Sequence, residues 1–295
     1  MADYRYTIII PHRDIPQLLQ RCIDSIPQRD DMEVVIVDDN SDPLVTDLSQ
    51  LHLPAKNCRL IRTTEGRGAG YARNVGLDCS SSEFVLFCDA DDFYAEGLGD
   101  FLDEHAHTDC DLVFFDNLSI DCHTLQPLDR DNRTVSTRMA QHAPEKQQGA
   151  LRYQTPQPWT KLVRRELIDR HHIRFDEVPA ANDAWFGLMV GHHARKVAFS
   201  GQALYMRTIR SDSLIHAADK EHLLSRLEVG YRVNGFLHAH RLGDYYVNTW
   251  PYLTQLRHVG WWLFVSEALR YFRRTPRAFV LRHLLRRLRR VCRME

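Results

Sequence analysis

Two patterns of apolar residues alternate along the first two thirds of the chain. Short, mostly apolar runs are typical of strands that are buried on both faces of a parallel sheet. Such runs lie at 6–11 (YTIIIP), 33–38 (EVVIVD), 58–62 (CRLIR), 83–88 (EFVLFC) and 112–115 (LVFF). Helical spacing appears between them, for example after Pro16, where Leu19, Cys22 and Ile23 fall on one face. This alternation predicts an α/β fold with a mostly parallel central sheet flanked by helices.

The pattern changes in the second half of the chain. Polar residues dominate from 121 to 148, which predicts a surface loop over the site. Order resumes at 159–168, and a helical pattern begins at Asn182, a candidate helix cap, and Asp183. A strand is predicted at 197–207, and the chain from Ala217 is predicted to be largely helical.

We therefore expect two domains. The first spans 1–210, with a nucleotide-binding half over about 1–120 and an acceptor half over about 150–210. The second is a helical C-terminal extension over 211–295.

Carboxylates follow two of the predicted strands. Asp89, Asp91 and Asp92 come directly after the strand that begins at residue 83, and the carboxyl ends of parallel strands are where open α/β sheets bind ligands. Neighbouring carboxylates repel each other unless a cation compensates them, and hard oxygen ligands suit Mg²⁺ or Mn²⁺. The alternative is a plain acidic turn. Asp38 and Asp39 end the second strand in the same way.

A glycine-rich segment precedes the fourth predicted strand. Gly66, Gly68 and Gly70 lie just before Arg73 and Asn74. The spacing is GxGxG after the third strand, not GxGxxG after the first, which argues against a dinucleotide-binding motif. Small residues here allow a helix to begin close to a ligand or to the sheet.

Composition and charge set limits on the class of protein. With 295 residues and 44% hydrophobic content, the chain is globular. The net charge of −1 hides an asymmetry, because ten arginines and one glutamate lie between Arg270 and Glu295. In this tail, Leu281, Leu284, Leu285, Leu288 and Cys292 recur at helical spacing, with arginines mostly on the other side. The pattern suits an anionic membrane surface, and a solvated helix or an oligomer contact is the alternative.

Other partners and compartments are disfavoured. No base-reading module accompanies the basic tail, so nucleic acid is not an expected partner. The seven cysteines form no CxxC pair, and no signal peptide or transmembrane-length apolar run is found. We expect a cytoplasmic protein, peripheral at the inner face of the cytoplasmic membrane.

Several separated segments together resemble one family. The segments YTIIIPHRD, VVIVDDNSD, GRGAGYARNVGL and FVLFCDADD, in this order, resemble family 2 glycosyltransferases of the GT-A fold, the group that builds bacterial surface polysaccharides. The later segments WTKLVRREL, IRF and NDAWF resemble the acceptor half of the smaller members. The resemblance covers about residues 5–210. It implies inverting, metal-dependent transfer of a sugar from a nucleotide-diphosphate sugar, with UDP favoured, to a hydroxyl of a lipid-linked saccharide.

The resemblance also implies roles for individual residues. On the nucleotide-sugar side it places Pro11, Asp38, Asp39, Arg73, Asp89, Ala90 and Asp91. Asp38 or Asp39 would contact the nucleobase, and Arg73 the diphosphate or the base. Asp91 and Asp89 match the DXD motif, with Asp91 as the expected metal ligand. Asp183 matches the acidic residue that removes the proton from the acceptor hydroxyl.

The acceptor side and the departures from the family pattern complete this prediction. Trp159 and Lys161 match a W-x-K segment, and Trp159 either stacks on a sugar or packs in the core. Asn182 replaces the glutamate that usually precedes the base, and His12 starts a segment that differs from many members. A non-catalytic sugar-nucleotide-binding protein and a sugar-phosphate nucleotidyltransferase are the alternatives. A dehalogenase-type phosphatase fits less well, because its Asp-x-Asp normally lies on the first strand.

Overall fold

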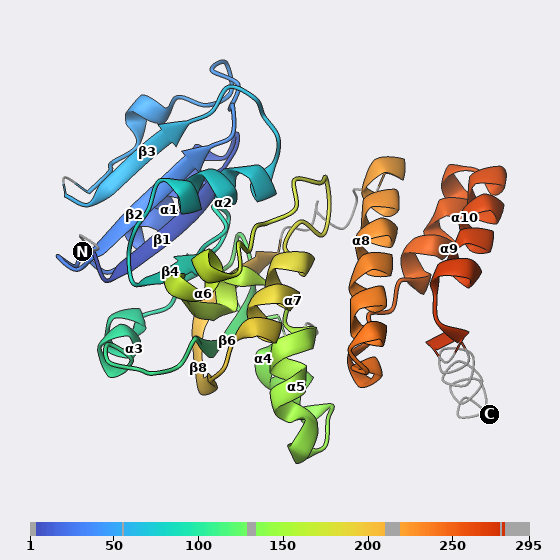
Figure 1. The fold of residues 1–295 in the computed structure, drawn as a ribbon. Coiled ribbons are helices and arrows are strands. Elements are labelled where there is room, and N and C mark those ends of the chain that lie inside the picture. Colours follow the sequence, from blue (N-terminus) through green and yellow to red (C-terminus); the bar gives the residue numbers. More distant parts are fainter. Residues whose placement is uncertain (1–3, 55, 129–133, 210–218, 278, 281–295) are drawn as a thin grey trace. The chain divides into compact units, whose positions relative to one another are not determined.

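The computed structural model describes residues 4–54, 56–128, 134–209, 219–277 and 279–280. The chain forms two compact units (Figure 1). The first consists of Met1–Val178 and Asn182–Ile215, and the second of Pro179–Ala181 and His216–Glu295. Each unit is described by itself below.

The first unit is built on one sheet. Among the described residues it contains β1 (Tyr6–His12), β2 (Met32–Asp38), β3 (Cys58–Arg62), β4 (Phe84–Phe87), β5 (Phe93–Tyr94), β6 (Leu112–Asp121), β7 (Lys161–Arg164) and β8 (Val197–Ile209). The strand order is β3-β2-β1-β4-β7-β6-β8-β5. Strands β3, β2, β1 and β4 run parallel, as do β6 and β8, while β7 is antiparallel to both its neighbours and β5 is antiparallel to β8.

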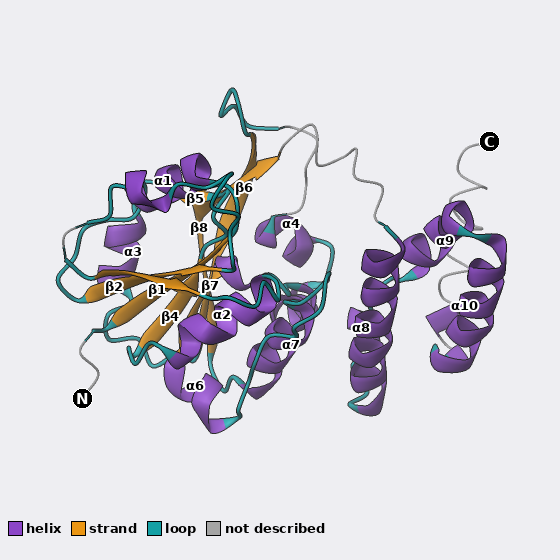
Figure 2. Cartoon of the chain, turned by 90° about the horizontal axis from the view of Figure 1, so that it is seen from above, coloured by secondary structure: helices purple, strands orange, loops and turns teal. Residues whose placement is uncertain are grey.

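Helices cover both faces of this sheet. They are α1 (Pro16–Asp24), α2 (Ala69–Asp78), α3 (Leu98–Glu104), α4 (Val135–Ala140), α5 (Pro144–Gln154), α6 (Arg165–Arg170) and α7 (Ala184–His193), with short 3₁₀ turns η1 (Leu48–Gln50) and η2 (Pro158–Thr160). Figure 2 shows α1 and α3 on one face and α2, α6 and α7 on the other. Two hydrophobic cores result, because alternate side chains of each strand point to opposite faces.

The strand interiors explain why the parallel half forms as predicted. All seven residues of β1 and all seven of β2 are buried, as expected for strands that are covered on both faces. The register pairs Tyr6 with Met32 at one end and His12 with Asp38 at the other. The polar residues that follow both strands therefore meet at one edge of the sheet.

The loop predicted over 121–148 is wrong from residue 135 onward, while 122–128 form the turn that follows β6. This stretch contains α4 and the beginning of α5, and Thr134 caps α4 by accepting a hydrogen bond from the Thr137 amide. The buried carboxylate of Asp116 also accepts from the Val135 amide, at 2.7 Å. Little apolar periodicity marks α5, whose buried residues are Ala150 and Leu151, so polar composition hid the helix.

The second unit is helical. Its described elements are α8 (Lys220–Ala239), η4 (Gly243–Tyr245), α9 (Trp250–Val259) and α10 (Trp261–Arg274). A separate core joins α8, α9 and α10 through Leu227, Leu253 and Tyr271, all fully or almost fully buried. In the described part of the chain, no helix is long and apolar enough to cross a bilayer.

Candidate active site

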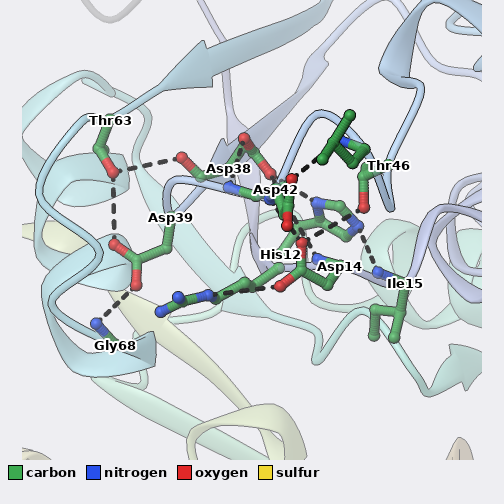
Figure 3. Close-up of polar contacts among 12 residues, drawn as sticks. His12, Asp14, Ile15, Asp38, Asp39, Asp42, Thr46, Thr63 and Gly68 are labelled. Carbon is green, nitrogen blue, oxygen red and sulfur yellow. Dashed lines mark hydrogen bonds and ion pairs between the residues drawn. The ribbon is translucent and has the colours of Figure 1, made fainter.

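The ends of β1 and β2 are joined by a buried histidine (Figure 3). His12 Nε2 accepts a hydrogen bond from the Ile15 amide, at 3.2 Å, which leaves the proton on Nδ1. Nδ1 donates this proton to Asp38 Oδ1 at 2.8 Å, and Ser41 Oγ donates to the same oxygen at 2.5 Å. Burial alone would raise the pKa of Asp38, but the hydrogen bonds from His12 and Ser41 outweigh it and lower the pKa.

Asp39 holds the start of the glycine-rich segment. Its carboxylate accepts hydrogen bonds from the amides of Arg67, at 3.1 Å, and Gly68, at 2.6 Å, and from Thr63 Oγ1, at 3.3 Å. Gly68 has a φ of +91°, in the left-handed region that glycine adopts without strain. Figure 3 shows Asp39 pointing to Thr63 on one side and to Gly68 on the other. Both carboxylates at the end of β2 are thus bound by the protein's own groups.

Helix α2 places Arg73 in the middle of the site. The Asn74 side chain donates to the Phe175 carbonyl at 3.0 Å and accepts from the Phe175 amide at 2.9 Å, which fixes α2 against the segment before α7. At Gly70 an added Cβ would lie 2.0 Å from the Asp176 carbonyl oxygen. The residue must therefore be glycine for α2 to lie this close.

Arg73 connects the two halves of the predicted site. Its guanidinium donates to Asp89 Oδ1 at 2.5 Å and to Asn182 Oδ1 at 2.9 Å, and it lies 5.3 Å from the centre of the Phe175 ring. Arg73 is 5% exposed, so both hydrogen bonds are shielded from water. Asp89, at the end of β4, and Asn182, next to Asp183, are thereby brought to one guanidinium.

The acidic turn after β4 is held from two directions. Asp92 is 4% exposed and points into the protein, where its carboxyl accepts from Tyr205 Oη and from the Thr208 amide, both at 2.7 Å. The Asp91 carbonyl accepts from Arg21 at 2.7 Å and from Thr208 Oγ1 at 2.5 Å. Burial, followed by the charges of Asp91 and Asp89, raises the pKa of Asp92 well above its ordinary value.

Asp183 lies at the N-terminus of α7. It occupies the N-cap position but makes no capping hydrogen bond with its side chain. The Asn182 side chain does not cap α7 either, contrary to prediction, because its Oδ1 accepts from Arg73. Burial raises the pKa of the Asp183 carboxyl; the Arg73 charge opposes this shift and the Asp89 charge adds to it. A carboxyl with a raised pKa suits a general base.

Lys161 is fully buried at the start of β7. Its ammonium donates to the Gln157 carbonyl and lies 5.3 Å from the centre of the Phe114 ring. Burial lowers the pKa of Lys161 to about 7, and the charge of Asp183 opposes this shift. The charges of Lys161 and Asp183 therefore shift each other's pKa. This interaction couples the W-x-K segment to the candidate base.

Comparison with known proteins identifies the family. The sequence profile of glycosyl transferase family 2 matches residues 7–171 of this chain. The chain belongs to glycosyl transferase family 2.

Curated relatives of this family 2 chain are distant and longer. The putative glycosyltransferase EpsH of Bacillus subtilis (strain 168) is 24% identical over 217 residues, which cover 69% of this chain and 60% of EpsH. The uncharacterized glycosyltransferase EpsJ of the same strain is 25% identical over 241 residues, covering 79% of this chain and 70% of EpsJ. The poly(ribitol-phosphate) beta-N-acetylglucosaminyltransferase TarS of Staphylococcus aureus (strain Mu50) is 27% identical over 226 residues, covering 72% of this chain but 37% of TarS.

Solved structures confirm the fold class. The crystal structure of S. aureus TarS 1–349 in complex with UDP-GlcNAc matches with a TM-score of 0.57 and 20% identity, covering 78% of this chain and 65% of that one. The mannosyltransferase PcManGT from Pyrobaculum calidifontis, in complex with GDP-Man and Mn²⁺, matches with a TM-score of 0.51 and 17% identity, covering 91% of this chain and 80% of that one. The α/β sheet with flanking helices and a helical C-terminal region is therefore the predicted GT-A type.

The acidic turn of this family 2 chain fits a divalent cation. Within the described residues, no three His, Cys, Asp or Glu side chains form a complete metal site. Mg²⁺ and similar hard cations commonly use one or two carboxylates and take their other ligands from substrate phosphates and water. Asp89 and Asp91 provide such a pair, and a cation there would offset their charges, which after burial are the next causes of the raised pKa of Asp92.

The remaining predicted residues lie around the same edge of the sheet. Trp159 is 8% exposed and stacks on Tyr205, with ring centres 4.5 Å apart, which favours the core alternative for its ring. Ala90 is buried in the core below the turn. Pro11 lies beyond Ile9, the last residue of β1 that pairs with β4. Its missing N–H therefore costs no hydrogen bond between these two strands.

Sequence analysis missed three residues that hold the acidic turn. Arg21, Tyr205 and Thr208 bind the backbone or side chains of Asp91 and Asp92, and Tyr205 Oη also accepts from the Asp89 amide at 3.1 Å. Tyr205 lies 113 positions from Asp92 in sequence, and an aromatic residue in a predicted strand carries no signal of this contact.

Proposed function

We propose that this chain is an inverting, metal-dependent glycosyltransferase. It moves a sugar from a nucleotide-diphosphate sugar, a UDP-sugar by preference, to a hydroxyl of a lipid-linked saccharide in cell-surface polysaccharide synthesis. Membership of glycosyl transferase family 2 and the surface-polymer relatives support the class of reaction. The titles of the structural neighbours, which name UDP-GlcNAc and GDP-Man as bound, support a nucleotide-sugar donor.

The observation that carries the proposal is the position of Arg73. One guanidinium bonds to Asp89 of the acidic turn and to Asn182, the neighbour of Asp183. A donor diphosphate at the turn and an acceptor hydroxyl at Asp183 would therefore lie at one site. The raised pKa of the Asp183 carboxyl beside that site supports a general base in addition to donor binding.

Each residue has a defined task in the proposed reaction. Asp183 accepts the proton of the acceptor hydroxyl, whose oxygen forms the new bond to the anomeric carbon while the bond to the diphosphate oxygen breaks. Attack from the face opposite the diphosphate inverts an α-linked donor to a β-linked product. Arg73 donates N–H groups toward the leaving diphosphate, and Asp39 or Asp38 faces the nucleobase side. Trp159 and Lys161 support the acceptor side.

Asp91 and Asp89 would hold the divalent cation. When bound, Mg²⁺ or Mn²⁺ supplies positive charge against the charge that develops on the diphosphate.

Donor hydrolysis provides the test. Purified protein is incubated without acceptor with UDP-glucose, UDP-galactose, their N-acetyl forms and GDP-mannose, each with Mn²⁺, Mg²⁺ or EDTA. We expect release of the nucleoside diphosphate from one donor, lost in EDTA and in Asp91→Asn but kept in the control Asp100→Asn, an exposed carboxylate of α3. Failure to release and failure to bind either UDP or GDP by calorimetry with metal would contradict the proposal.

A non-catalytic sugar-nucleotide-binding protein is the second candidate. Asn182 stands where the family usually has glutamate, and its amide is already bonded to Arg73. Metal-dependent binding of UDP without turnover, in the presence of a range of saccharide acceptors, would favour this candidate.

We also retain the predicted domains and location as part of the proposal. A GT-A domain over 1–210 carries the reaction and a helical extension over 211–295 follows it. The protein is proposed to be cytoplasmic and to work peripherally at the inner face of the cytoplasmic membrane. The arginine-rich segment from residue 281 lies outside the described residues.

A further inference from the structure

Helix α10 exposes large apolar side chains along one side. Trp261 is 63% exposed, Trp262 84%, Leu269 57% and Phe272 53%. Positions 262, 269 and 272 follow the i, i+7, i+10 spacing of one helix face, and Trp261 flanks it. Two such exposed tryptophans on one helix are unusual in a soluble protein. Exposed apolar patches commonly mark surfaces that bind a protein, a ligand or a membrane.

The other side of α10 already has its partners. Tyr271 is 1% exposed and packs edge-on against Trp250, with ring centres 5.4 Å apart. Arg270 and Arg274 both bond to Glu228 of α8, at 2.6 and 2.5 Å. These contacts fix which side of α10 faces the helical unit, so the apolar face is turned away from α8 and α9.

The charge beside this face is positive. Arg273 and Arg277 are exposed, and the one acidic residue within α10, Glu267, has a side chain that is 13% exposed. The sequence after residue 277 adds six further arginines and one glutamate. Aromatic side chains beside exposed arginines are the composition of a helix that lies in the plane of an anionic bilayer surface.

We propose that α10 is a membrane-interface helix whose aromatic face, Trp261, Trp262, Leu269 and Phe272, enters the head-group region of an anionic lipid bilayer. Indole rings favour this boundary, since they combine a large apolar surface with one N–H donor. The arginines beside the face contact lipid phosphates. The proposal rests on the proposed function for its purpose, which is to place the enzyme at the surface that carries a lipid-linked acceptor.

Charge favours a bilayer over the other occupants of this face. A second copy docked face to face with its α10 parallel would bring Arg273 and Arg277 of the two chains together. The chain's own segment 281–295 carries further arginines and would repel the same surface. An anionic bilayer attracts both the helix and the tail.

Vesicle flotation of the full-length chain tests the proposal. The protein is mixed with vesicles of phosphatidylcholine alone or with about 30% phosphatidylglycerol, at an ionic strength of about 0.15 M. The variants are Trp261→Ser/Trp262→Ser, Arg273→Glu and the control Leu44→Ser, which removes a side chain that is 94% exposed in the first unit. Circular dichroism verifies that each variant is folded.

We expect wild type and Leu44→Ser to float with the anionic vesicles alone. The double tryptophan variant should lose about tenfold or more of its partition coefficient, and Arg273→Glu about fivefold. No flotation of wild type, or equal flotation of the double tryptophan variant, would overturn the proposal. So would a concentration-dependent dimer in solution that the tryptophan changes disperse, because the face would then be a contact between copies.

A separate readout distinguishes this proposal from the enzymatic one. Release of nucleoside diphosphate in solution without vesicles should be the same in wild type and in all three variants. If flotation follows the expected order while no donor is hydrolysed or bound, the membrane proposal stands and the proposed function fails.

Discussion

The ends of β2 and β4 carry the same residue type in opposite electrostatic states. At the end of β2, Asp38 and Asp39 accept hydrogen bonds from His12, from hydroxyls and from loop amides, and the pKa of Asp38 is lowered. At the end of β4, three carboxyls are crowded together, and burial and their mutual repulsion raise the pKa of Asp92. Across the site, burial also raises the pKa of Asp183.

The difference separates carboxylates that the protein's own donors stabilise from carboxyls whose ionisation is opposed by burial and by neighbouring charges. The protein's own donors form hydrogen bonds to the carboxylates at the end of β2, so substitutions there should mainly lower the free energy of unfolding. At β4 and α7, burial and neighbouring negative charges raise the pKa values of Asp92 and Asp183, and a cation, a diphosphate and an acceptor would complete the site. Substitutions of the carboxyls after β4 and at the start of α7 should mainly lower kcat. The following experiments challenge this division, beginning with the largest expected effect.

Removal of the candidate base should cost the most activity. Asp183→Asn keeps the shape of the side chain but cannot accept the hydroxyl proton, so kcat should fall by about 10²–10⁴-fold. The donor dissociation constant, measured by calorimetry with Mn²⁺, should stay within about twofold, because the base acts on the transition state. Asp169→Asn, an exposed partner of Arg165, is the control. Undiminished kcat in Asp183→Asn would remove Asp183 from the mechanism.

Neighbouring carboxyls of the acidic turn should respond differently to the same change. Asp91→Asn should lower kcat by about 10²–10³-fold and weaken Mn²⁺ activation, since it removes a proposed cation ligand. Asp92→Asn should change kcat by less than about threefold, because the Asp92 side chain points into the protein, where Tyr205 and Thr208 bind it. Equal losses in the two variants would mean that the turn acts as one unit and that Asp92 is not structural.

His12→Ala should affect stability more than chemistry. It removes one of the hydrogen-bond donors to the buried Asp38 carboxylate, which should lower the free energy of unfolding by about 1–3 kcal/mol. Urea unfolding of the wild type, His12→Ala and the exposed control His107→Ala gives this value. If His12→Ala unfolds like wild type yet loses donor binding, the end of β2 belongs to the binding site in the same sense as β4.

The smallest effect should appear in the pH profile. A base must be ionised, so kcat should fall about tenfold per pH unit below the pKa of Asp183. Because burial raises that pKa above 3.8, the acid limb should lie above the limb of an ordinary aspartate. Lys161→Met removes a positive charge that lowers the pKa of Asp183, so the limb should move to still higher pH. If the acid limb moves to lower pH or does not move, the charge of Lys161 does not lower the pKa of Asp183.

The parallel half of the fold was predictable because its signal is local. Each buried strand is a short apolar run, and the polar residues that follow His12, Asp38 and Cys88 mark where these runs end. The family resemblance then placed Asp89, Asp91, Arg73 and Asp183 near one another. The roles assigned to them remain predictions.

The contacts that position the site were not predictable, because they join distant parts of the chain. Arg73 and Asn182 are 109 positions apart, and the bond between them turned a predicted helix cap into a partner of the arginine. The four residues of β7 run antiparallel between β4 and β6, a reversal that no local pattern in Lys161–Arg164 encodes. The inward turn of Asp92 depends on Tyr205 and Thr208 of β8 in the same way.

Gly70 has a consequence for directed evolution of the proposed donor preference of this chain. An added Cβ at this position would lie 2.0 Å from the Asp176 carbonyl oxygen, so library members with any other residue there would have to shift α2 or the segment that contains Asp176. Exposed neighbours such as Arg13 and Arg67 impose no such limit. A library should therefore vary Arg13 and Arg67 and keep Gly70 unchanged.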